Sequence, residues 1–417
     1  MQEALLLGGV TLPSGQTADV RLEGGRIAAV TAPGGGDLPA EQRLDLDGYL
    51  VLPAPAEPHA HLDTALTADR VPNPAGDLAG AIRAWLDWQA SVSRDDFVDR
   101  ATEAALLGLA NGTTAIRTHV GIYEAVGIKA VEALLEVRER LRGLVDLQLV
   151  ALTLQLTGPE RTDMRAMLRA ALDLGVDVVG GCPHLDPDPR AYHDLTLSLA
   201  TRLGRPIDLH TDETLDLAVL HLPHFADMVA ETGFPYGATA SHCVSLGMQP
   251  PTVTADVAAR VAAARVAVVC NPQTNLFLQA RGQQFAPARG LTALRPLLHA
   301  GVTVAGGGDN LRDPFNLLGR ADPLETASLL VSAGHLTLEE AYAAVSAGAR
   351  AAMGLSEVQV APGFPAELLA VRASSLGEAI AGGTSRVVIH QGRVVSRTTV
   401  TRDYPGATAV AAGRPMP

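Results

Sequence analysis

Two histidines separated by a single residue stand early in the chain, in the run EPHAH at residues 57–61. Because alternate residues of a β-strand point to the same side, His59 and His61 can aim both imidazoles at one point. Two convergent imidazoles at a strand end make half of a transition-metal site. Taken alone, the pair is equally consistent with two ordinary histidines beside a loop.

Three later apolar runs also end in a residue that can bind a metal. His210 closes the run IDLH, His242 closes TASH, and Asp309 follows VTVAGGG. A (β/α)8 barrel builds its active site at the C-terminal ends of its strands, so four such strand ends in one chain favour the metal interpretation. We expect a mononuclear site with room for a bound water and the following four ligands: His59, His61, His210 and Asp309.

Neutral imidazoles and one carboxylate suit Zn(II) or Fe(II). Either ion lowers the pKa of a bound water toward neutrality and so provides a hydroxide nucleophile. These residue types therefore predict a hydrolytic site with one divalent metal ion as its cofactor.

A hydrolytic site also needs a group that moves protons. Glu213 follows His210 by three residues, an offset that can place its carboxylate near the substrate as a proton shuttle. It can instead be a glutamate at a helix start that stabilises the helix dipole. His242 is expected to bond the nucleophilic water and to stabilise charge at the attacked carbon. The alternative for His242 is a contact with the metal or with one of the metal's ligands.

Three further polar residues lie beside these motifs. His119 and His184 also stand at or just after the ends of expected strands, so we expect them at the same active-site mouth, either in its wall or beside the metal's ligands. Asp63 follows the first histidine pair, and we expect its carboxylate to orient a neighbouring imidazole.

The elements that position these residues follow from the pattern in the middle of the chain. Short β-branched segments alternate with helix-like segments, which is typical of a parallel sheet with crossover helices. Eight such strands predict a closed TIM barrel. An open doubly wound sheet is the alternative, but the glycine-rich fingerprint after its first strand is missing. The expected strands are 49–54, 113–119, 146–154, 176–180, 206–210, 238–242, 266–270 and 302–306, and the expected helices are 94–109, 125–142, 164–174, 192–203 and 255–264.

Both ends of the chain contain short strands separated by tight turns, and Gly-Gly pairs such as residues 24–25 mark hairpins. Neither end is long enough to bury a core well alone. We therefore expect residues 1–50 and 355–417 to combine into one small β-sandwich domain. Residues 51–354 are expected to form the barrel.

Composition narrows the classes of function. The formal net charge is −13 and no basic stripe occurs, which argues against nucleic acid. No apolar run is long enough to span a bilayer, and the N-terminus shows no signal peptide. The three cysteines have no close spacing, which indicates reduced thiols. We expect a cytoplasmic homo-oligomer with no nucleic-acid or membrane partner.

The chain resembles the amidohydrolase superfamily, and within it the cytosine deaminase-like subgroup, along nearly its whole length. The matching stretches are EPHAHLDT, ANGTTAIRTHV, DLQLVA, GVDVVGGCPHLD, DLHTDE, TASH, NPQTNLFLQAR and GGGDNLRDP. The resemblance implies the same four ligands, with Glu213 as the proton shuttle and His242 holding the nucleophilic water beside Asp309. It implies hydrolytic removal of ammonia from an aminopyrimidine with one Fe(II) or Zn(II).

The resemblance also bears on the number of metals. Binuclear members of the superfamily commonly carry a carboxylated lysine on the fourth barrel strand. The only lysine here is Lys129, in an expected helix, so a lysine-bridged pair of metals is excluded.

At positions where the subgroup has residues that bind the substrate, this chain has different residues. Where it has a glutamine on the third strand, the ungapped position here is Leu154, with Gln155 next to it, and a shift of one residue turns a side chain to the other face. Its second aspartate after the last strand is Asn310, and the tryptophan of the following loop is Phe315. A leucine in place of the buried glutamine leaves the polar edge of cytosine without a hydrogen-bond partner, so we expect a different substrate.

Three functions stay open from the sequence. The first is a deaminase of a small nitrogen heterocycle. The second uses the same machinery to break another C–N bond of a cyclic amide or aminotriazine, with alkylamine release or ring opening. The third is a catalytically silent binding protein, which the retained Glu213 and His242 argue against.

Overall fold

The structure, a computed structural model, describes residues 4–34 and 42–403. The chain divides into two compact units. One contains Met1–Ala54, Leu109–Thr114 and Glu357–Pro417, and the other contains Pro55–Gly108 and Ala115–Ser356. The expected β-domain residues 35–41 and 404–417 lie outside the described part of the chain.

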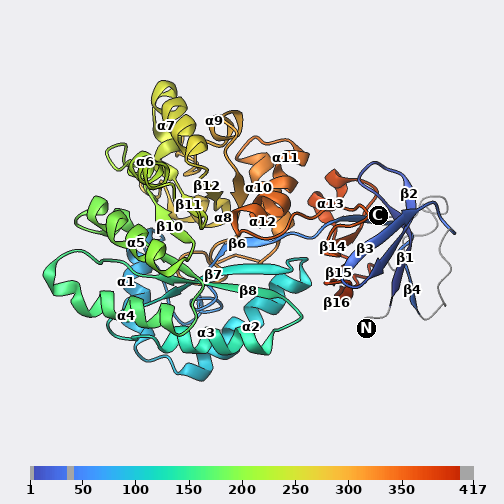
Figure 1. Ribbon diagram of the computed structural model, residues 1–417, viewed down its shortest axis with the longest axis horizontal. Helices are drawn as coiled ribbons and strands as arrows, with labels where there is room; N and C mark the ends of the chain where they lie inside the picture. Colours follow the sequence, from blue (N-terminus) through green and yellow to red (C-terminus); the bar gives the residue numbers. More distant parts are fainter. Residues whose placement is uncertain (1–3, 35–41, 404–417) are drawn as a thin grey trace. The chain divides into compact units, whose positions relative to one another are not determined.

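Eight parallel strands form the larger unit's sheet, in chain order from one edge to the other, with helices between them (Figure 1). The two edges meet where the backbone N–H of Asp309 donates to the carbonyl of His59 at 3.0 Å, so the sheet is a nearly closed barrel. The TIM-barrel prediction is confirmed. The strands are β6 (Glu57–Ala60), β7 (Ala115–Gly121), β8 (Asp146–Leu152), β9 (Val178–Gly181), β10 (Ile207–Thr211), β11 (Ala238–His242), β12 (Ala267–Cys270) and β13 (Val304–Gly306).

Helices follow the strands, and several begin where the sequence offers an acidic cap. The Asp188 side chain accepts from Ala191 N before Pro189, and the helix that starts there ends at Gly204 with φ +62°, a left-handed residue that glycine adopts at little cost. The helices of the barrel are α1 (Leu78–Gln89), α2 (Arg94–Ala110), α3 (Lys129–Arg140), α4 (Thr162–Asp173), α5 (Pro189–Leu203), α6 (Leu222–Thr232), α7 (Pro251–Ala263), α8 (Pro272–Leu278), α9 (Leu294–His299), α10 (Pro323–Ser332), α11 (Leu338–Ala343) and α12 (Ala349–Ala352).

One expected barrel strand belongs elsewhere. The apolar segment 49–54 forms β5 (Tyr49–Pro53), which pairs antiparallel with β14 (Leu368–Arg372) in the terminal sheet. The first barrel strand is the short β6, which carries His59 itself. The partner of β5 lies more than 300 residues away in sequence, and no local pattern specifies such a pairing.

The terminal strands make one mixed sheet in the order β16-β15-β14-β5-β1-β2-β3, with β4 paired to β1. The β2–β3 hairpin turns at Gly24 and Gly25, whose φ angles are +56° and +76°, the conformation that Gly-Gly turns supply. Apolar side chains from both ends of the chain share its core, among them Leu7, Val20 and Ile389. The remaining elements are β1 (Leu5–Thr11), β2 (Thr17–Glu23), β3 (Arg26–Thr31), β4 (Arg43–Asp45), β15 (Arg386–His390), β16 (Arg393–Thr398) and α13 (Leu376–Gly382).

A buried ion pair lies inside the barrel. Arg117 Nη1 on β7 donates to Asp208 Oδ2 on β10 at 2.9 Å, and Ser241 Oγ donates to the other carboxylate oxygen at 3.0 Å. Both charged side chains are almost completely buried. Because a buried charge without a partner is costly, these contacts link β7, β10 and β11 below the strand ends.

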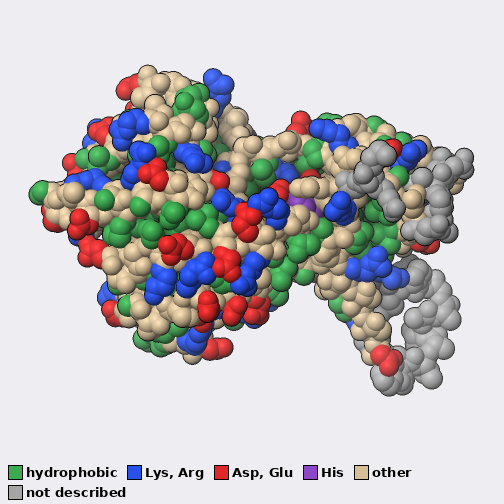
Figure 2. All heavy atoms as spheres, turned by 60° about the horizontal axis from the view of Figure 1, so that its bottom comes forward, with side chains coloured by type: hydrophobic (Ala, Val, Ile, Leu, Met, Phe, Trp, Pro, Cys, Tyr) green, Lys and Arg blue, Asp and Glu red, His purple; other side chains and the backbone are tan. Residues whose placement is uncertain are grey.

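The surface carries charged side chains of both signs, as the composition indicates (Figure 2). Figure 2 shows acidic and basic side chains interspersed over the face in view. Within residues 4–34 and 42–403, every helix is too short or too polar to cross a membrane.

Candidate active site

The four predicted ligands converge at the C-terminal ends of the barrel strands. His61 Nε2 lies 3.1 Å from His210 Nε2 and 3.3 Å from Asp309 Oδ1, and His59 Nε2 lies 3.6 Å from the same oxygen. Ligand atoms about 2.0–2.1 Å from one ion are themselves roughly 3–3.5 Å apart. The observed separations are therefore those of donors that can share one ion.

The donor atoms also have the chemistry of a metal site. Both ring nitrogens of His59, Nδ1 of His210 and both carboxylate oxygens of Asp309 are buried without a hydrogen bond from the described residues. Burial lowers the pKa of His59 and of His210 well below the usual value, so their imidazoles are neutral, the form that binds metal. The donor set fits a divalent ion.

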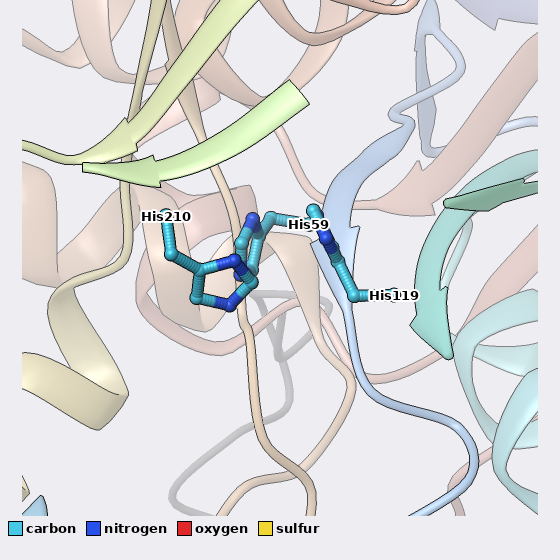
Figure 3. Close-up of side chains that lie close together, drawn as sticks. All are labelled: His59, His119 and His210. Atoms are coloured by element: carbon cyan, nitrogen blue, oxygen red, sulfur yellow. The ribbon is translucent and has the colours of Figure 1, made fainter. Parts of the chain in front are cut away.

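His119 belongs to the same cluster and not to the substrate wall. Its ring centroid lies 4.1 Å from that of His59, and neither of its ring nitrogens has a hydrogen-bond partner among the described residues. Figure 3 shows His59, His119 and His210, which come from three different strands. Across residues 4–34 and 42–403, two groups have donor atoms close enough to hold an ion, His59 with His119 and His210, and His59 with His242 and Asp309. Of the two positions expected for His119, this geometry is that of a residue beside the metal's ligands, and its ring is fully buried.

Several side chains at this end of the barrel stand on strained backbone. His242, Cys243, Asp309 and Asp212 have φ angles of +69°, +47°, +63° and +50°. This left-handed conformation costs roughly 1–2 kcal/mol for a residue with a side chain. Such strain concentrates at functional sites, where the surrounding structure holds it in place.

Glu213 and His242 lie together beside the ligand cluster. Glu213 Oε1 is 3.4 Å from His242 Nδ1, and His242 Nε2 is 3.9 Å from Asp309 Oδ2. Burial and the nearby Asp309 raise the pKa of Glu213 well above its usual value. Asn275, from α8, places its Nδ2 3.2 Å from Glu213 Oε1 and 3.2 Å from His242 Nδ1.

Asp63 has a different role from the one expected. Its carboxylate accepts from the backbone N–H of Gly121 at 2.9 Å and of Thr64 at 3.1 Å, and no imidazole hydrogen-bonds to it among the described residues. The side chain therefore joins the loop after β6 to the end of β7. Backbone N–H groups of Gly121 and Thr64 supply the hydrogen bonds that an imidazole was expected to supply.

The cluster opens into a cavity with about 580 Å³ of empty space, a volume that includes open solvent. His61, His210, Glu213, His242 and Asp309 form its floor. Its wall is largely apolar and comes from α1 and from the loops after β8, β9 and β13. The wall residues include Leu78, Ile82, Trp85, Leu86, Leu154, His184, Leu185, Asn310 and Phe315.

Leu154 lines this inner cavity, and Gln155 does not. Gln155 faces an outer cavity, where its Oε1 accepts from Arg161 Nη2 at 2.7 Å and its Nε2 donates to the carbonyl of Leu185 at 3.3 Å. Both ends of the amide are thus occupied by the protein. The ungapped reading of the sequence, which puts Leu154 in the substrate pocket, matches this geometry, and Gln155, the alternative, lies outside the inner cavity.

The other expected wall residues line the inner cavity. His184 Nδ1 bonds the carbonyl of His210 at 3.1 Å, which makes Nδ1 the donor and leaves Nε2 as an acceptor. Asn310 Nδ2 donates to Asp313 Oδ2 at 2.7 Å. The backbone N–H of Phe315 donates to the other oxygen of Asp313 at 2.9 Å, so Asp313 holds the loop that carries both wall residues.

Glu57 also shapes the site, and the sequence reasoning missed it. Its carboxylate accepts from the backbone N–H of His59 at 3.0 Å and of Gly308 at 2.8 Å. A Cβ at Gly308 would lie 3.0 Å from Glu57 Oε2, and one at Gly307 would lie 2.6 Å from Asn271 Oδ1. The glycine run therefore lets the backbone approach Glu57 closely, as its composition suggested. The position of Glu57 two residues before His59 was the available signal.

Trp85 and Asn275 were also missed. Trp85 is almost fully buried in the wall, and its helical segment carried no chemical motif. Asn275 lies in the stretch NPQTNLFLQAR, whose likeness to the subgroup gave it no role.

Comparison with known proteins agrees with this geometry. A family model described as "Amidohydrolase family" matches residues 90–396. The chain is 33% identical over 408 residues to a pterin deaminase of Rhizobium rhizogenes, covering 95% of this chain and 92% of that protein.

Two solved structures extend the likeness to the fold. A 5-methylcytosine deaminase of Klebsiella pneumoniae, with 5-fluorocytosine bound, has a TM-score of 0.86 at 26% identity and covers 97% of this chain and 100% of its own. An N-isopropylammelide isopropylaminohydrolase of Burkholderia multivorans has a TM-score of 0.83 at 30% identity and covers 95% and 99%. These relatives act on different ring compounds with one shared architecture.

Proposed function

The chain belongs to the amidohydrolase family, and from that premise we propose that it is a metal-dependent deaminase of an amino-substituted nitrogen heterocycle. The chain is an enzyme that acts on C–N bonds of cyclic compounds, because it belongs to this family and resembles deaminases and hydrolases of such compounds. The observation that carries the proposal is the convergence of Glu213, His242 and the ligand cluster on one cavity with an apolar wall.

His59, His61, His210 and Asp309 are the residues we assign to the metal, which is Zn(II) or Fe(II) by ligand type. When bound, such an ion lowers the pKa of water and so makes a nucleophile available near neutral pH. The compact donor cluster and the absence of lysine on the barrel strands support a single ion.

The side chains around the cluster supply the proton handling. Glu213 accepts a proton from the attacking water and returns it to the departing amino nitrogen, which leaves as ammonia. The ring carbon gains the oxygen of water, so one water is consumed for each ammonia released. His242 lies between Glu213 and Asp309, where it can bond the nucleophilic water and stabilise charge at the attacked carbon.

We propose that the substrate is a fused aminopyrimidine of the pterin kind, and that cytosine is poor. The likeness to a pterin deaminase over nearly the whole chain supports this. The inner and the outer cavity adjoin, because Ile82, Leu86, Tyr123, Leu154 and Leu185 line both. A ring larger than cytosine would extend from the inner cavity toward the outer one, and the apolar Leu154 offers no hydrogen bond to a polar edge.

Release of an alkylamine from a triazine is the second candidate. The likeness to the isopropylaminohydrolase of Burkholderia multivorans favours it, and the apolar wall residues suit an alkyl substituent. The two candidates differ in the amine that leaves, because one yields ammonia and the other yields the alkylamine.

A substrate panel tests the proposal. The metal-loaded protein is incubated with pterin, cytosine, N-isopropylammelide and creatinine, and ammonia and isopropylamine are measured separately. We expect ammonia from pterin at the highest kcat/KM. Isopropylamine release without ammonia from pterin would replace the first proposal by the second, and no product from any ring would contradict both.

We also propose that the protein is cytoplasmic and homo-oligomeric. The three cysteines are free and buried in the described residues, which supports a reducing compartment such as the cytoplasm. We also retain the prediction of a homo-oligomer, which size-exclusion chromatography with light scattering tests.

A further inference from the structure

The amide of Asn275 lies between the two groups to which the proposed reaction assigns proton handling. Its Nδ2 is 3.2 Å from Glu213 Oε1 and 3.2 Å from His242 Nδ1. The two groups themselves are 3.4 Å apart. All three side chains are buried.

The direction of these hydrogen bonds fixes where the proton of His242 resides. An amide nitrogen carries two protons and only donates. With one N–H on Glu213 Oε1, the second faces His242 Nδ1, which must accept it. A ring nitrogen that accepts a hydrogen bond carries no proton, and an imidazole always keeps at least one N–H. That proton is therefore on Nε2.

The opposite tautomer makes two poor contacts. A proton on Nδ1 would face the donor group of Asn275 even if it reached Glu213. The lone pair of Nε2 would then point toward the carboxylate of Asp309, whose Oδ2 is 3.9 Å away. Two acceptors facing each other in a buried site repel, whereas an Nε2–H is attracted to the carboxylate.

Asn271 completes the arrangement on the other side of the ring. Its amide group lies 3.4 Å from His242 Nε2, and its Oδ1 has no hydrogen-bond partner among the described residues. Turning the amide over brings Oδ1 to Nε2–H and supplies the missing partner. Asn271 and Asn275 then bracket the imidazole, with one on each ring nitrogen.

We propose that Asn275 is a positioning residue that holds His242 in the Nε2–H tautomer and fixes one oxygen of Glu213. The other oxygen of Glu213 is then free to carry the proton, and Nε2–H faces the reaction side. The inference rests on the proposed function only in the roles of Glu213 and His242. The tautomer itself is a property of the resting protein.

The kinetic test uses Asn275→Asp and Asn275→Leu, which keep the approximate shape and remove both donors. We expect kcat for ammonia release from pterin to fall about 10²-fold or more, the scale of a disrupted acid–base group, with KM nearly unchanged. The matched control is Gln273→Glu on the same helix, because the Gln273 amide donates to Thr326 Oγ1 at 2.7 Å and lies outside this triangle. The control should keep the wild-type kcat.

The second test does not need turnover. The zinc-loaded protein is labelled with nitrogen-15 at histidine, and the His242 signals are identified by their loss in His242→Gln. We expect Nδ1 of His242 to be the unprotonated nitrogen in the wild type. In Asn275→Asp the new carboxylate should draw a proton to Nδ1, while metal content stays at the wild-type level.

The outcomes separate the two proposals. A wild-type Nδ1–H, or an Asn275→Asp variant with normal kcat, overturns the positioning role. The expected tautomer with no turnover of pterin or any other ring leaves Asn275 in place and contradicts the proposed deaminase. If both Asn275 variants fail to fold, the wild-type tautomer decides alone.

Discussion

The floor and the wall of the inner cavity are built in different ways. Floor side chains stand at strand ends, and Asp309 N even donates to the carbonyl of His59 as part of barrel closure. The wall comes from α1 and from loops, with Leu154 and Phe315 half-buried beside Asn310. The floor is thus tied to the backbone that forms the fold, whereas the wall is attached to connecting segments.

This difference separates the reaction from the choice of substrate. A donor at a barrel strand end cannot move without disturbing the sheet, so it suits chemistry that requires fixed geometry. Loops tolerate exchange of side chains, so a wall made of them can accommodate new rings while the floor stays unchanged. We therefore expect floor substitutions to affect metal and kcat, and wall substitutions to affect stability and specificity.

The largest effect is expected from Asp309→Ala. The change removes a carboxylate that closes the donor cluster and lies near His242, so both bound metal and turnover should be lost. Elemental analysis should find one equivalent of divalent metal in the wild type. The surface variant Asp227→Ala is the control and should keep both metal and activity. Two equivalents in the wild type, or none after metal-supplemented growth, would contradict the mononuclear floor.

Glu213→Gln should separate proton transfer from metal binding. The amide keeps the shape and one acceptor but cannot relay a proton, so kcat should fall by about 10²–10⁴-fold. Metal content and thermal unfolding should match the wild type. A near-normal rate would make Glu213 a structural residue and would break the assignment of proton transfer to the floor.

Trp85→Ala tests the wall without touching the floor. Trp85 is 2% exposed and its ring centroid lies 5.5 Å from that of Trp88. Removal of a buried tryptophan costs about 3–5 kcal/mol of unfolding free energy. Chemical denaturation should record that loss while elemental analysis still finds one metal per chain. Metal loss in the folded variant would show that wall and floor are not separable.

Leu154→Gln should have the smallest effect, and it concerns specificity. A new hydrogen bond of about 0.5–1.5 kcal/mol corresponds to roughly a 2–10-fold gain in kcat/KM for cytosine. Gln155→Leu is the matched control, because Gln155 faces the outer cavity, and it should not alter cytosine turnover. Efficient cytosine deamination by the wild type would refute the expectation that the apolar wall makes cytosine a poor substrate. An unchanged rate in Leu154→Gln would point to Gly308 or Asn310 instead.

The floor was predictable because its information is local. His59, His210, His242 and Asp309 each sit at or beside the end of an apolar strand-like run, and parallel strands in a barrel bring their C-terminal ends together. Alternation of strand and helix patterns was sufficient to predict that barrel. The ends of the expected parallel strands and the residue types found there were therefore sufficient to predict these ligands, without any knowledge of long-range contacts.

Other features depended on contacts that no local pattern encodes. The run 49–54 has the composition of a barrel strand, yet β5 pairs with β14 far along the chain. Asp63 is adjacent to the histidines in sequence but bonds the end of β7. His119 lies within β7, two residues before its end, and only the tertiary structure shows its ring beside that of His59.

The sequence by itself determined the barrel, the metal-binding residue types and the class of chemistry, because these depend on periodicity and on side-chain donors at strand ends. Only the tertiary structure decided that Leu154 faces the inner cavity and Gln155 does not, and that Asn275 contacts both Glu213 and His242. The physical reason is that side chains alternate between the two faces only within a strand, so the direction of a side chain beyond the strand end does not follow from its position in sequence. Its direction is set by partners such as Arg161 and the carbonyl of Leu185, which come from other parts of the chain.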